Sequence, residues 1–449
     1  MREKFMRNKH TFIALTLCAV LLLSGCNADK PAETLPVTEE VTKTTTAEVT
    51  TAAASATTSE VATTTTTTAK TEPELPESDF GYYLQSDNTI YICDYHGTDK
   101  DVIVPEYIGK YPVTSIMMPL MPESYAENTE IETVTLPKTI NTMQFHEYLS
   151  VSTIKSYSVD PENEKYTAVD GVLYSKDMTK LLLYPPAKEG RFTVPDSVTE
   201  IGGGSFSYCV GLTTVNIGSN VKTIGVCAFE NSSVSEVNIA EGLESIEWEA
   251  FCWTKELESI VLPRSLKTIE SRAFESSALR SVTLPTAIDK FCSDVFTMTE
   301  LSEINLVDNG EGLYMWNDIL RKGDELIRMI KGSKVEKLVF DRTLTSLDCV
   351  FENCTNLKVI EIMDDCDFII TMTEFGDFIG CTSIEQMYIP GSVVSCPFYH
   401  YYQEMSPDLV VYTPEKGENS SDGRNSGEKC KFVYVDSYED YLKAVRETG

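Results

Sequence analysis

Residues 246–263 read IEWEAFCWTKELESIVLP, and residues 269–285 read IESRAFESSALRSVTLP. Both stretches run Ile-Glu, two variable residues, Ala-Phe, a polar gap, and spaced aliphatic residues that end in Leu-Pro. Such agreement has two explanations: a catalytic motif occurs twice, or both stretches are copies of one structural repeat. The spacing of the shared letters along the rest of the chain decides between them.

The phenylalanine of this pattern recurs at a nearly constant interval of 22 or 23 residues. Each phenylalanine is followed in the sequence by the pattern aliphatic-x-x-aliphatic-x-aliphatic, as in Leu257, Ile260 and Leu262. The last two aliphatic residues are two apart, so they point to one face of a short strand while their neighbours point to the other. The phenylalanines are Phe206, Phe229, Phe251, Phe274 and Phe296, and after an interruption Phe351 and Phe378.

A period of 22–23 residues with one strand per unit is typical of a leucine-rich-repeat solenoid. A single unit cannot bury its own apolar face, and stacking of neighbours forms one continuous core. The sequence therefore predicts a repeat solenoid that is mainly β with short turns. The shared letters of the two opening stretches are then core and turn positions and not catalytic residues.

The unit AF-x-x-C-x-x-L-x-x-I-x-LP-x-x-L-x-x-I resembles that of the BspA-like leucine-rich-repeat proteins of bacterial surfaces. The resemblance extends over roughly residues 80–390, and residues 90–116 resemble the opening unit of that family. One unit departs from it with Ser205 in place of Ala, and the 22-residue units have Ser232 or Ser277 near the Cys position. The resemblance implies adhesion to host or neighbouring-cell proteins, or to matrix.

Two insertions interrupt the repeat, and a different pattern follows it. Residues 166–186 and 313–330 each place a polar turn between apolar stretches, which predicts two β-hairpins. Beyond residue 390 the repeat decays, and two short apolar strands and the stretch YEDYLKAVRE predict a small C-terminal α/β cap over residues 391–449.

The N-terminus has the features of an export signal. Four basic residues precede an apolar run from Thr11 to Leu23, too short and wrongly flanked for a stable membrane span. The run ends in Leu-Ser-Gly-Cys, which resembles a bacterial lipobox and implies cleavage before Cys26 and lipid on its thiol. An ordinary signal peptide with an incidental cysteine is the alternative. Residues 1–25 are therefore predicted to be a lipoprotein signal peptide, and the mature chain to be membrane-anchored outside the cytoplasm.

Residues 26–79 are predicted to form a disordered linker, since residues 31–79 contain seventeen threonines and little apolar surface. The whole chain has a formal charge of −32, and loss of residues 1–25, with four basic and one acidic residue, makes it −35. Such a chain repels nucleic acid and anionic lipid head groups, which excludes both as favoured partners.

Metal, cofactor and enzyme signatures are missing from the sequence. Cys209, Cys354 and Cys381 occupy one repeated position, as a buried small hydrophobic residue would, and no Cys-x-x-Cys pair suggests a metal site. We predict no cofactor and no catalytic residues. Cys396 and Cys430 lie outside the repeat, where a disulfide between them is an option that the sequence leaves open.

The candidate binding residues lie on the outward side of the strands, where small polar side chains form two rows along one face. A merely solvated sheet face is the alternative. Trp248 and Trp253 beside Phe251 are further candidates, although packing between units would also explain them. The outward candidates are Thr214, Asn216, Glu236, Asn238, Ser259, Val261, Ser281, Thr283, Glu303, Asn305 and Tyr388.

Two functions remain. The first is a lipid-anchored, non-catalytic surface protein that binds an extracellular protein and mediates adhesion. The second is a glycan-binding or scaffold lipoprotein that serves a cell-envelope or polysaccharide-degrading system. The framework residues encode the stack and leave the ligand open, because the surface positions vary independently of it.

Overall fold

The structure is a computed structural model of the 449-residue chain. It describes residues 77–118, 130–145, 153–307, 312–322, 325–340, 350–364, 380–390, 409–413 and 431–448. The chain divides into two units, Met1–Glu72 and Pro73–Gly449, and every described residue belongs to the second.

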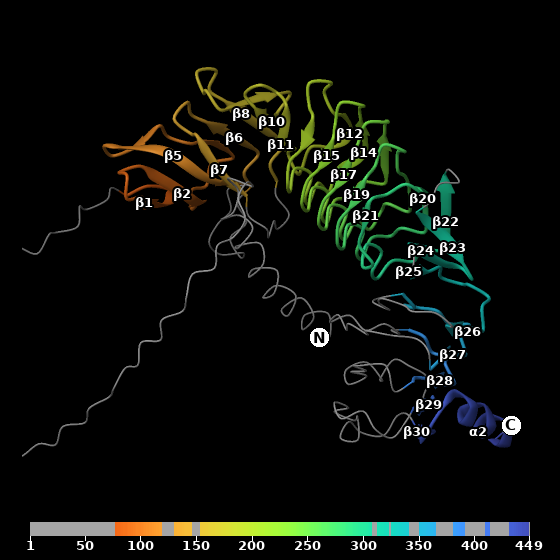
Figure 1. Cartoon of the computed structure of the whole chain (residues 1–449). Coiled ribbons are helices and arrows are strands. Elements are labelled where there is room, and N and C mark those ends of the chain that lie inside the picture. The colour runs from red at the N-terminus through yellow and green to blue at the C-terminus, as the bar shows by residue number, and fades with distance from the viewer. Residues whose placement is uncertain are drawn as a thin grey trace, which may run out of the picture. The chain divides into compact units, whose positions relative to one another are not determined.

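The central part of the chain is a leucine-rich-repeat β-solenoid, as predicted (Figure 1). Each turn contributes one long strand to the first face and one two-residue strand to a second, and strands in successive turns run parallel. The long strands are β12 (Gly190–Thr193), β14 (Leu212–Ile217), β16 (Glu236–Ile239), β18 (Ser259–Val261), β20 (Ser281–Pro285) and β22 (Glu303–Val307). The short strands are β13 (Glu200–Ile201), β15 (Thr223–Ile224), β17 (Ser245–Ile246), β19 (Thr268–Ile269) and β21 (Lys290–Phe291).

The repeated phenylalanines form the axis of the core. Ring centroids of Phe206 and Phe229 are 4.7 Å apart, those of Phe229 and Phe251 4.8 Å, and those of Phe251 and Phe274 5.1 Å, with nearly parallel planes. Each ring is fully buried, so consecutive units share one ladder of aromatic contacts. This ladder explains why a phenylalanine recurs in each of these units, and units of both 22 and 23 residues keep their rings in the stack.

The N-terminal segment has its own sheets and a core that includes Ile90, Val113 and Ile116. Leu173 and Leu183 of the first insertion pack into the same core. The expected opening unit therefore packs directly against the first insertion. The strands are β1 (Phe80–Leu84), β2 (Ile90–Tyr95), β3 (Asp101–Ile103), β4 (Tyr107–Ile108), β5 (Tyr111–Met118), β6 (Thr133–Leu136), β7 (Thr142–Phe145) and β8 (Ser156–Val159).

Both predicted hairpins are confirmed, and each has a third strand. β10 pairs antiparallel with β9 and with β11, whose far side pairs parallel with β13 and so joins the solenoid. The second insertion is an antiparallel meander in which β24 lies between β23 and β25. The strands are β9 (Tyr166–Val169), β10 (Val172–Ser175), β11 (Lys180–Leu183), β23 (Leu313–Trp316), β24 (Ile319–Lys322) and β25 (Glu325–Met329).

The C-terminal part continues the parallel ladder and ends in a helix, α2 (Tyr438–Thr448). Ser437 begins this helix, since its hydroxyl accepts the N–H of Asp440 and donates to the carboxylate of the same residue. Within the described residues, no helix has the length and apolar character needed to cross a membrane. The strands are β26 (Lys337–Phe340), β27 (Val359–Ile362), β28 (Gln386–Tyr388), β29 (Val410–Thr413) and β30 (Lys431–Tyr434).

Candidate binding surface

The outward side chains of the long strands stand in two rows, because parallel pairing places equivalent residues side by side. Thr214 pairs with Glu236 and Asn216 with Asn238 between β14 and β16. The same two positions are in register through β18, β20 and β22. The rows comprise Ser259, Ser281 and Glu303 on one side and Val261, Thr283 and Asn305 on the other.

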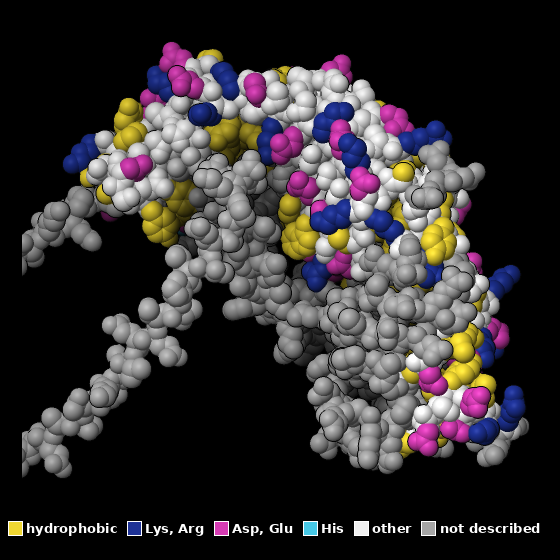
Figure 2. All heavy atoms as spheres, viewed as in Figure 1, with side chains coloured by type: hydrophobic (Ala, Val, Ile, Leu, Met, Phe, Trp, Pro, Cys, Tyr) yellow, Lys and Arg dark blue, Asp and Glu magenta, His cyan; other side chains and the backbone are white. Residues whose placement is uncertain are grey.

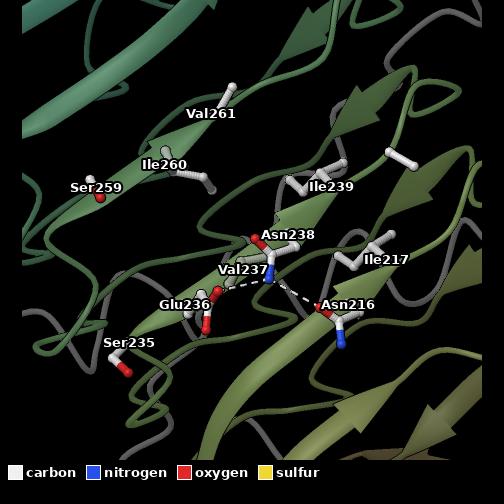
Figure 3. Close-up of a pocket in the computed structure, with 11 residues that line it drawn as sticks. Asn216, Ile217, Ser235, Glu236, Val237, Asn238, Ile239, Ser259, Ile260 and Val261 are labelled. Atoms are coloured by element: carbon white, nitrogen blue, oxygen red, sulfur yellow. Dashed lines mark hydrogen bonds between the residues drawn. The ribbon is translucent and has the colours of Figure 1, made fainter.

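Hydrogen bonds hold the polar side chains of β14 and β16 in place (Figure 3). The Asn238 amide donates to Glu236 Oε1 and to Asn216 Oδ1, both at 3.0 Å. The Thr214 hydroxyl donates to Glu236 Oε2 at 3.1 Å. Hydrogen bonds from Asn238 and Thr214 lower the pKa of the Glu236 carboxyl, which keeps it ionised. The surface therefore presents an ordered carboxylate beside two amides.

The ladder of long strands breaks between β16 and β18. β12, β14 and β16 form one sheet, and β18, β20 and β22 form the next. The step from Val237 to Ile260 is one residue longer than the steps on either side, because the unit of Phe251 has an extra residue before its strand. The equally long step from Phe192 to Val215 also has an irregular register, at Gly190 and Arg191. The step from Val134 to Tyr157 is equally long and its strands pair regularly, so a longer unit accompanies the break but does not by itself cause it.

A shallow pocket of about 450 Å³ lies at this break. Besides the outward residues, Ser235, Ile217, Val237, Ile239 and Ile260 line it, and sequence reasoning did not include them (Figure 3). The extra residue in the Phe251 unit coincides with the break, but an equally long step between β6 and β8 pairs regularly, so the sequence held no sufficient signal for them. Five of the predicted candidates line the pocket: Asn216, Glu236, Asn238, Ser259 and Val261.

The other outward candidates differ in exposure. Thr214 is only 4% exposed, so it orients Glu236 and offers little contact surface of its own. Ser281 and Thr283 are half-buried, and Glu303 and Asn305 are exposed.

The expectation that Tyr388 lies on an open face is wrong. Its side chain is fully buried, with its ring 5.0 Å from that of Tyr441 and 5.2 Å from that of Tyr438, both on α2. Its hydroxyl donates to the Asp364 carboxylate, which also accepts the backbone N–H of Tyr438. The helix covers the outward face of β28, a contact between segments fifty residues apart in the chain.

The two tryptophans lie away from these rows, on the turns that contain the ladder phenylalanines. Trp248 is half-buried, and Trp253 is 43% exposed. The Lys255 ammonium lies 4.4 Å from the centroid of the Trp253 ring.

The thiols predicted for the core are buried: Cys209, Cys354 and Cys381. Burial raises the pKa of the Cys209 thiol far above its usual value.

Among the described residues, no group of His, Cys, Asp or Glu is arranged to hold a metal ion. His96 contacts the Asp94 carboxylate at 2.9 Å. Cys26, Cys396 and Cys430 lie outside the described residues, as do His146, Phe378 and residues 1–25.

Comparison with known families supports the interpretation of the repeat. Residues 188–309 and 329–411 match the model of the BspA type leucine rich repeat region, with six copies. The two matched stretches together make up somewhat less than half of the chain and are similar to that repeat region. The first matched stretch contains all of the long strands from β12 to β22 and the pocket between β16 and β18.

Several solved structures are similar in part. A leucine rich cell surface protein from Faecalibacterium prausnitzii is 17% identical, with a TM-score of 0.43, 83% of this chain and 98% of that chain covered. A leucine-rich repeat protein from Bacteroides ovatus is 16% identical, with a TM-score of 0.31 and coverage of 80% and 100%. The pneumococcal vaccine antigen PcpA is 18% identical, with a TM-score of 0.36, and 73% of this chain matches 60% of that one. A search of curated proteins gives no match.

Proposed function

We propose that this protein is a lipid-anchored, non-catalytic surface protein that binds an extracellular protein through the outward side chains of β14 to β22 and thereby mediates adhesion. The observation that carries the proposal is the pocket at the break between β16 and β18, lined by ordered amide, carboxylate and hydroxyl groups beside an exposed apolar residue. Val261, at the rim, is 64% exposed.

The two faces of the solenoid differ in the charged side chains that a partner would have to cover. On the short-strand face, ammonium and carboxylate groups of adjacent turns pair with each other, and Figure 2 shows acidic and basic side chains interspersed on the face in view. The pairs include Lys180 with Glu200 at 2.5 Å, Lys267 with Glu244 at 2.6 Å and Lys290 with Glu270 at 2.6 Å. A partner that covered this face would have to desolvate paired charges, which is costly.

A partner that binds the long-strand face has a smaller desolvation cost to overcome. Amides and hydroxyls such as Asn216, Asn238 and Ser259 can exchange water for a partner's hydrogen bonds, and Val261 adds apolar contact. The cores of protein interfaces are depleted of charged residues, and Glu236 is the one charged residue among those that line the pocket. The residues that line the pocket include no aromatic side chain for stacking on a sugar, which favours a protein at this face.

The proposed anchor follows from the sequence of the N-terminus. Removal of residues 1–25 would leave Cys26 to carry the lipid, and residues 26–79 would hold the solenoid of residues 80–390 and its cap, 391–449, away from the membrane. In a lipid-labelling experiment in the bacterial cell, we expect radiolabelled palmitate on the parent chain and none on a Cys26→Ala variant. Label that persists in the variant would rule out this anchor.

Binding is tested with the full chain and an array of extracellular matrix and bacterial surface proteins. We expect Asn238→Arg and Val261→Arg each to weaken capture of the bound protein by about tenfold, equivalent to about 1.4 kcal/mol. Thr223→Arg on β15 is the matched control, because it adds the same charge to the short-strand face. Equal capture by all three variants would contradict the proposed face, and no protein captured by the parent would contradict the protein ligand.

A glycan ligand is the second candidate function. A separate observation, on the turns that contain the ladder phenylalanines, favours it.

A further inference from the structure

The turns that contain the ladder phenylalanines share an unusual backbone conformation. The second residue after each described phenylalanine of the ladder has a φ between 53° and 60°, in the left-handed region. Glycine and asparagine adopt this region most readily, and other side chains at such a φ cost roughly 1 kcal/mol or more. We call this row of positions the turn ridge: Tyr208, Asn231, Trp253, Ser276, Met298 and Asn353.

Half of the ridge positions carry a residue type that is poorly suited to a left-handed backbone. Asn231 and Asn353 belong to a residue type that tolerates the left-handed region, whereas Tyr208, Trp253 and Met298 are bulky. Trp253 is 43% exposed and Met298 is 46% exposed, so burial in the core does not account for them. Cys227, Glu249 and Arg272, each two residues before a ladder phenylalanine, have a φ of 53° to 57°, so the turn itself imposes the left-handed conformation. What distinguishes Trp253 and Met298 is a large apolar side chain exposed at such a position, which points to contact with a ligand.

The large residues occupy every second turn. Backbone hydrogen bonds run along the ridge from Asn231 N to Cys252 O at 3.0 Å, from Trp253 N to Glu275 O at 2.9 Å and from Ser276 N to Thr297 O at 2.9 Å. Neighbouring ridge positions are therefore one turn apart, and the phenylalanine rings beneath Trp253 give that step as 4.8 Å on one side and 5.1 Å on the other. Tyr208 and Met298 each lie two turns from Trp253.

The surroundings of Trp253 are polar and fixed. The Lys255 ammonium, 4.4 Å from the ring centroid, also donates to the carbonyl oxygen of Ser276 on the next turn. The Asn231 amide donates to the Glu230 carboxylate at 3.2 Å. An aromatic ring held beside carboxylate and amide groups suits a ligand with apolar C–H faces and many hydroxyls.

We propose that the turn ridge binds an extended, neutral, β-1,4-linked glycan, with a sugar ring stacked on the face of Trp253 opposite the Lys255 ammonium. In such a chain every second sugar presents the same face, and this two-sugar repeat is close to two turns of the ridge. Tyr208 and Met298 would then contact equivalent sugars on either side. The negative charge of the chain disfavours an anionic polymer. The proposal is independent of the long-strand face and of its protein ligand.

The test is cosedimentation of the full chain with insoluble cellulose and chitin, with starch, whose linkages are α, as the control polymer. We expect binding to cellulose or chitin and none to starch. Trp253→Asn should weaken binding about tenfold, equivalent to about 1.4 kcal/mol. Because asparagine suits the left-handed backbone better, the urea midpoint of this variant should equal or exceed that of the parent.

Two controls separate this result from others. Ser276→Ala changes a buried ridge position that carries no large side chain, adds no volume there, and should bind as the parent does. Asn238→Arg on the long-strand face should also leave glycan binding unchanged. The proposal is overturned if Trp253→Asn binds cellulose and chitin as well as the parent, if the parent binds neither, or if Trp253 is needed only for capture of a protein.

Discussion

The Arg328 guanidinium donates to the Glu352 carboxylate at 2.6 Å, and both side chains are almost completely buried. The same carboxylate oxygen accepts the backbone N–H of Met298 at 2.6 Å. In uninterrupted turns the equivalent N–H, such as that of Trp253, donates to a backbone carbonyl of the next turn. The Glu352 side chain therefore supplies the ladder hydrogen bond that the second insertion, residues 313–330, would otherwise break.

Substitution of Glu352 tests this bridge. Glu352→Ala would leave the Arg328 charge buried without its carboxylate, and we expect a loss of about 3–5 kcal/mol in the free energy of unfolding of the turns after the insertion. Hydrogen exchange of residues 350–364 is the measurement. The double variant Arg328→Met/Glu352→Met should lose less than Glu352→Ala, since it leaves no buried charge. An equal loss would show that the pair itself does not hold the turns together.

The aromatic ladder predicts a large effect of one truncation. Phe251 is stacked between Phe229 and Phe274, and Phe251→Ala should lower the free energy of unfolding by about 3–5 kcal/mol through lost contacts and a cavity. Phe251→Leu keeps most of the volume and should lose clearly less. Urea denaturation measures both. Equal stability of the parent and the alanine variant would contradict a continuous core at this turn.

Two buried carboxyls predict a pH dependence near neutrality. Arg272 lies 3.4 Å from both Glu249 and Glu275, and burial raises the pKa of each carboxyl to about 7. The unfolded value is about 4.3, so the stability from protonation is complete below that pH and is lost as pH rises through the folded pKa. The loss is on the order of 2 kcal/mol per carboxyl. Other carboxylates that act on the pair are Glu230, Asp294 and Glu352.

Urea midpoints between pH 5 and pH 8 measure this effect. We expect the parent to become less stable over this interval, and the double variant Glu249→Gln/Glu275→Gln to show a flatter profile because its amides do not titrate. Lys267→Ala/Glu244→Ala, on the exposed short-strand face, should follow the parent. A parent that gains stability as pH rises from 5 to 8 would refute the prediction.

Two carboxylates, those of Asp364 and Glu361, accept hydrogen bonds from α2, and Glu361 accepts those of two tyrosine side chains. Glu361 accepts the hydroxyls of Tyr438 at 2.5 Å and Tyr441 at 2.8 Å, and the Lys337 ammonium at 2.6 Å. Glu361→Ala should cost about 2–3 kcal/mol, because buried phenols lose a charged acceptor. Hydrogen exchange of residues 438–448 should then rise. Lys443→Ala removes only an exposed pair on the same helix and should change little; equal exchange in both variants would contradict this attachment.

The repeat could be predicted because its signal is local and recurs. The Phe, Ala, Leu and Ile positions of the repeat lie in the core, so Phe251 in one unit and Phe274 in the next occupy the same buried environment. The hairpins were predictable for the same reason, since turn residues and apolar stretches lie within one segment. The rows of Asn216, Asn238 and Asn305 also followed from the alternation of inward and outward side chains.

The sequence by itself determined the solenoid, its register and the outward side of each strand, because these depend on residues within one period. The tertiary structure decided which outward residues are open. Tyr388 and Asn238 occupy equivalent outward positions, yet α2 covers one and a sheet break exposes the other. Accessibility depends on segments far apart in the chain and on whether neighbouring strands stay paired, so no single repeat encodes it.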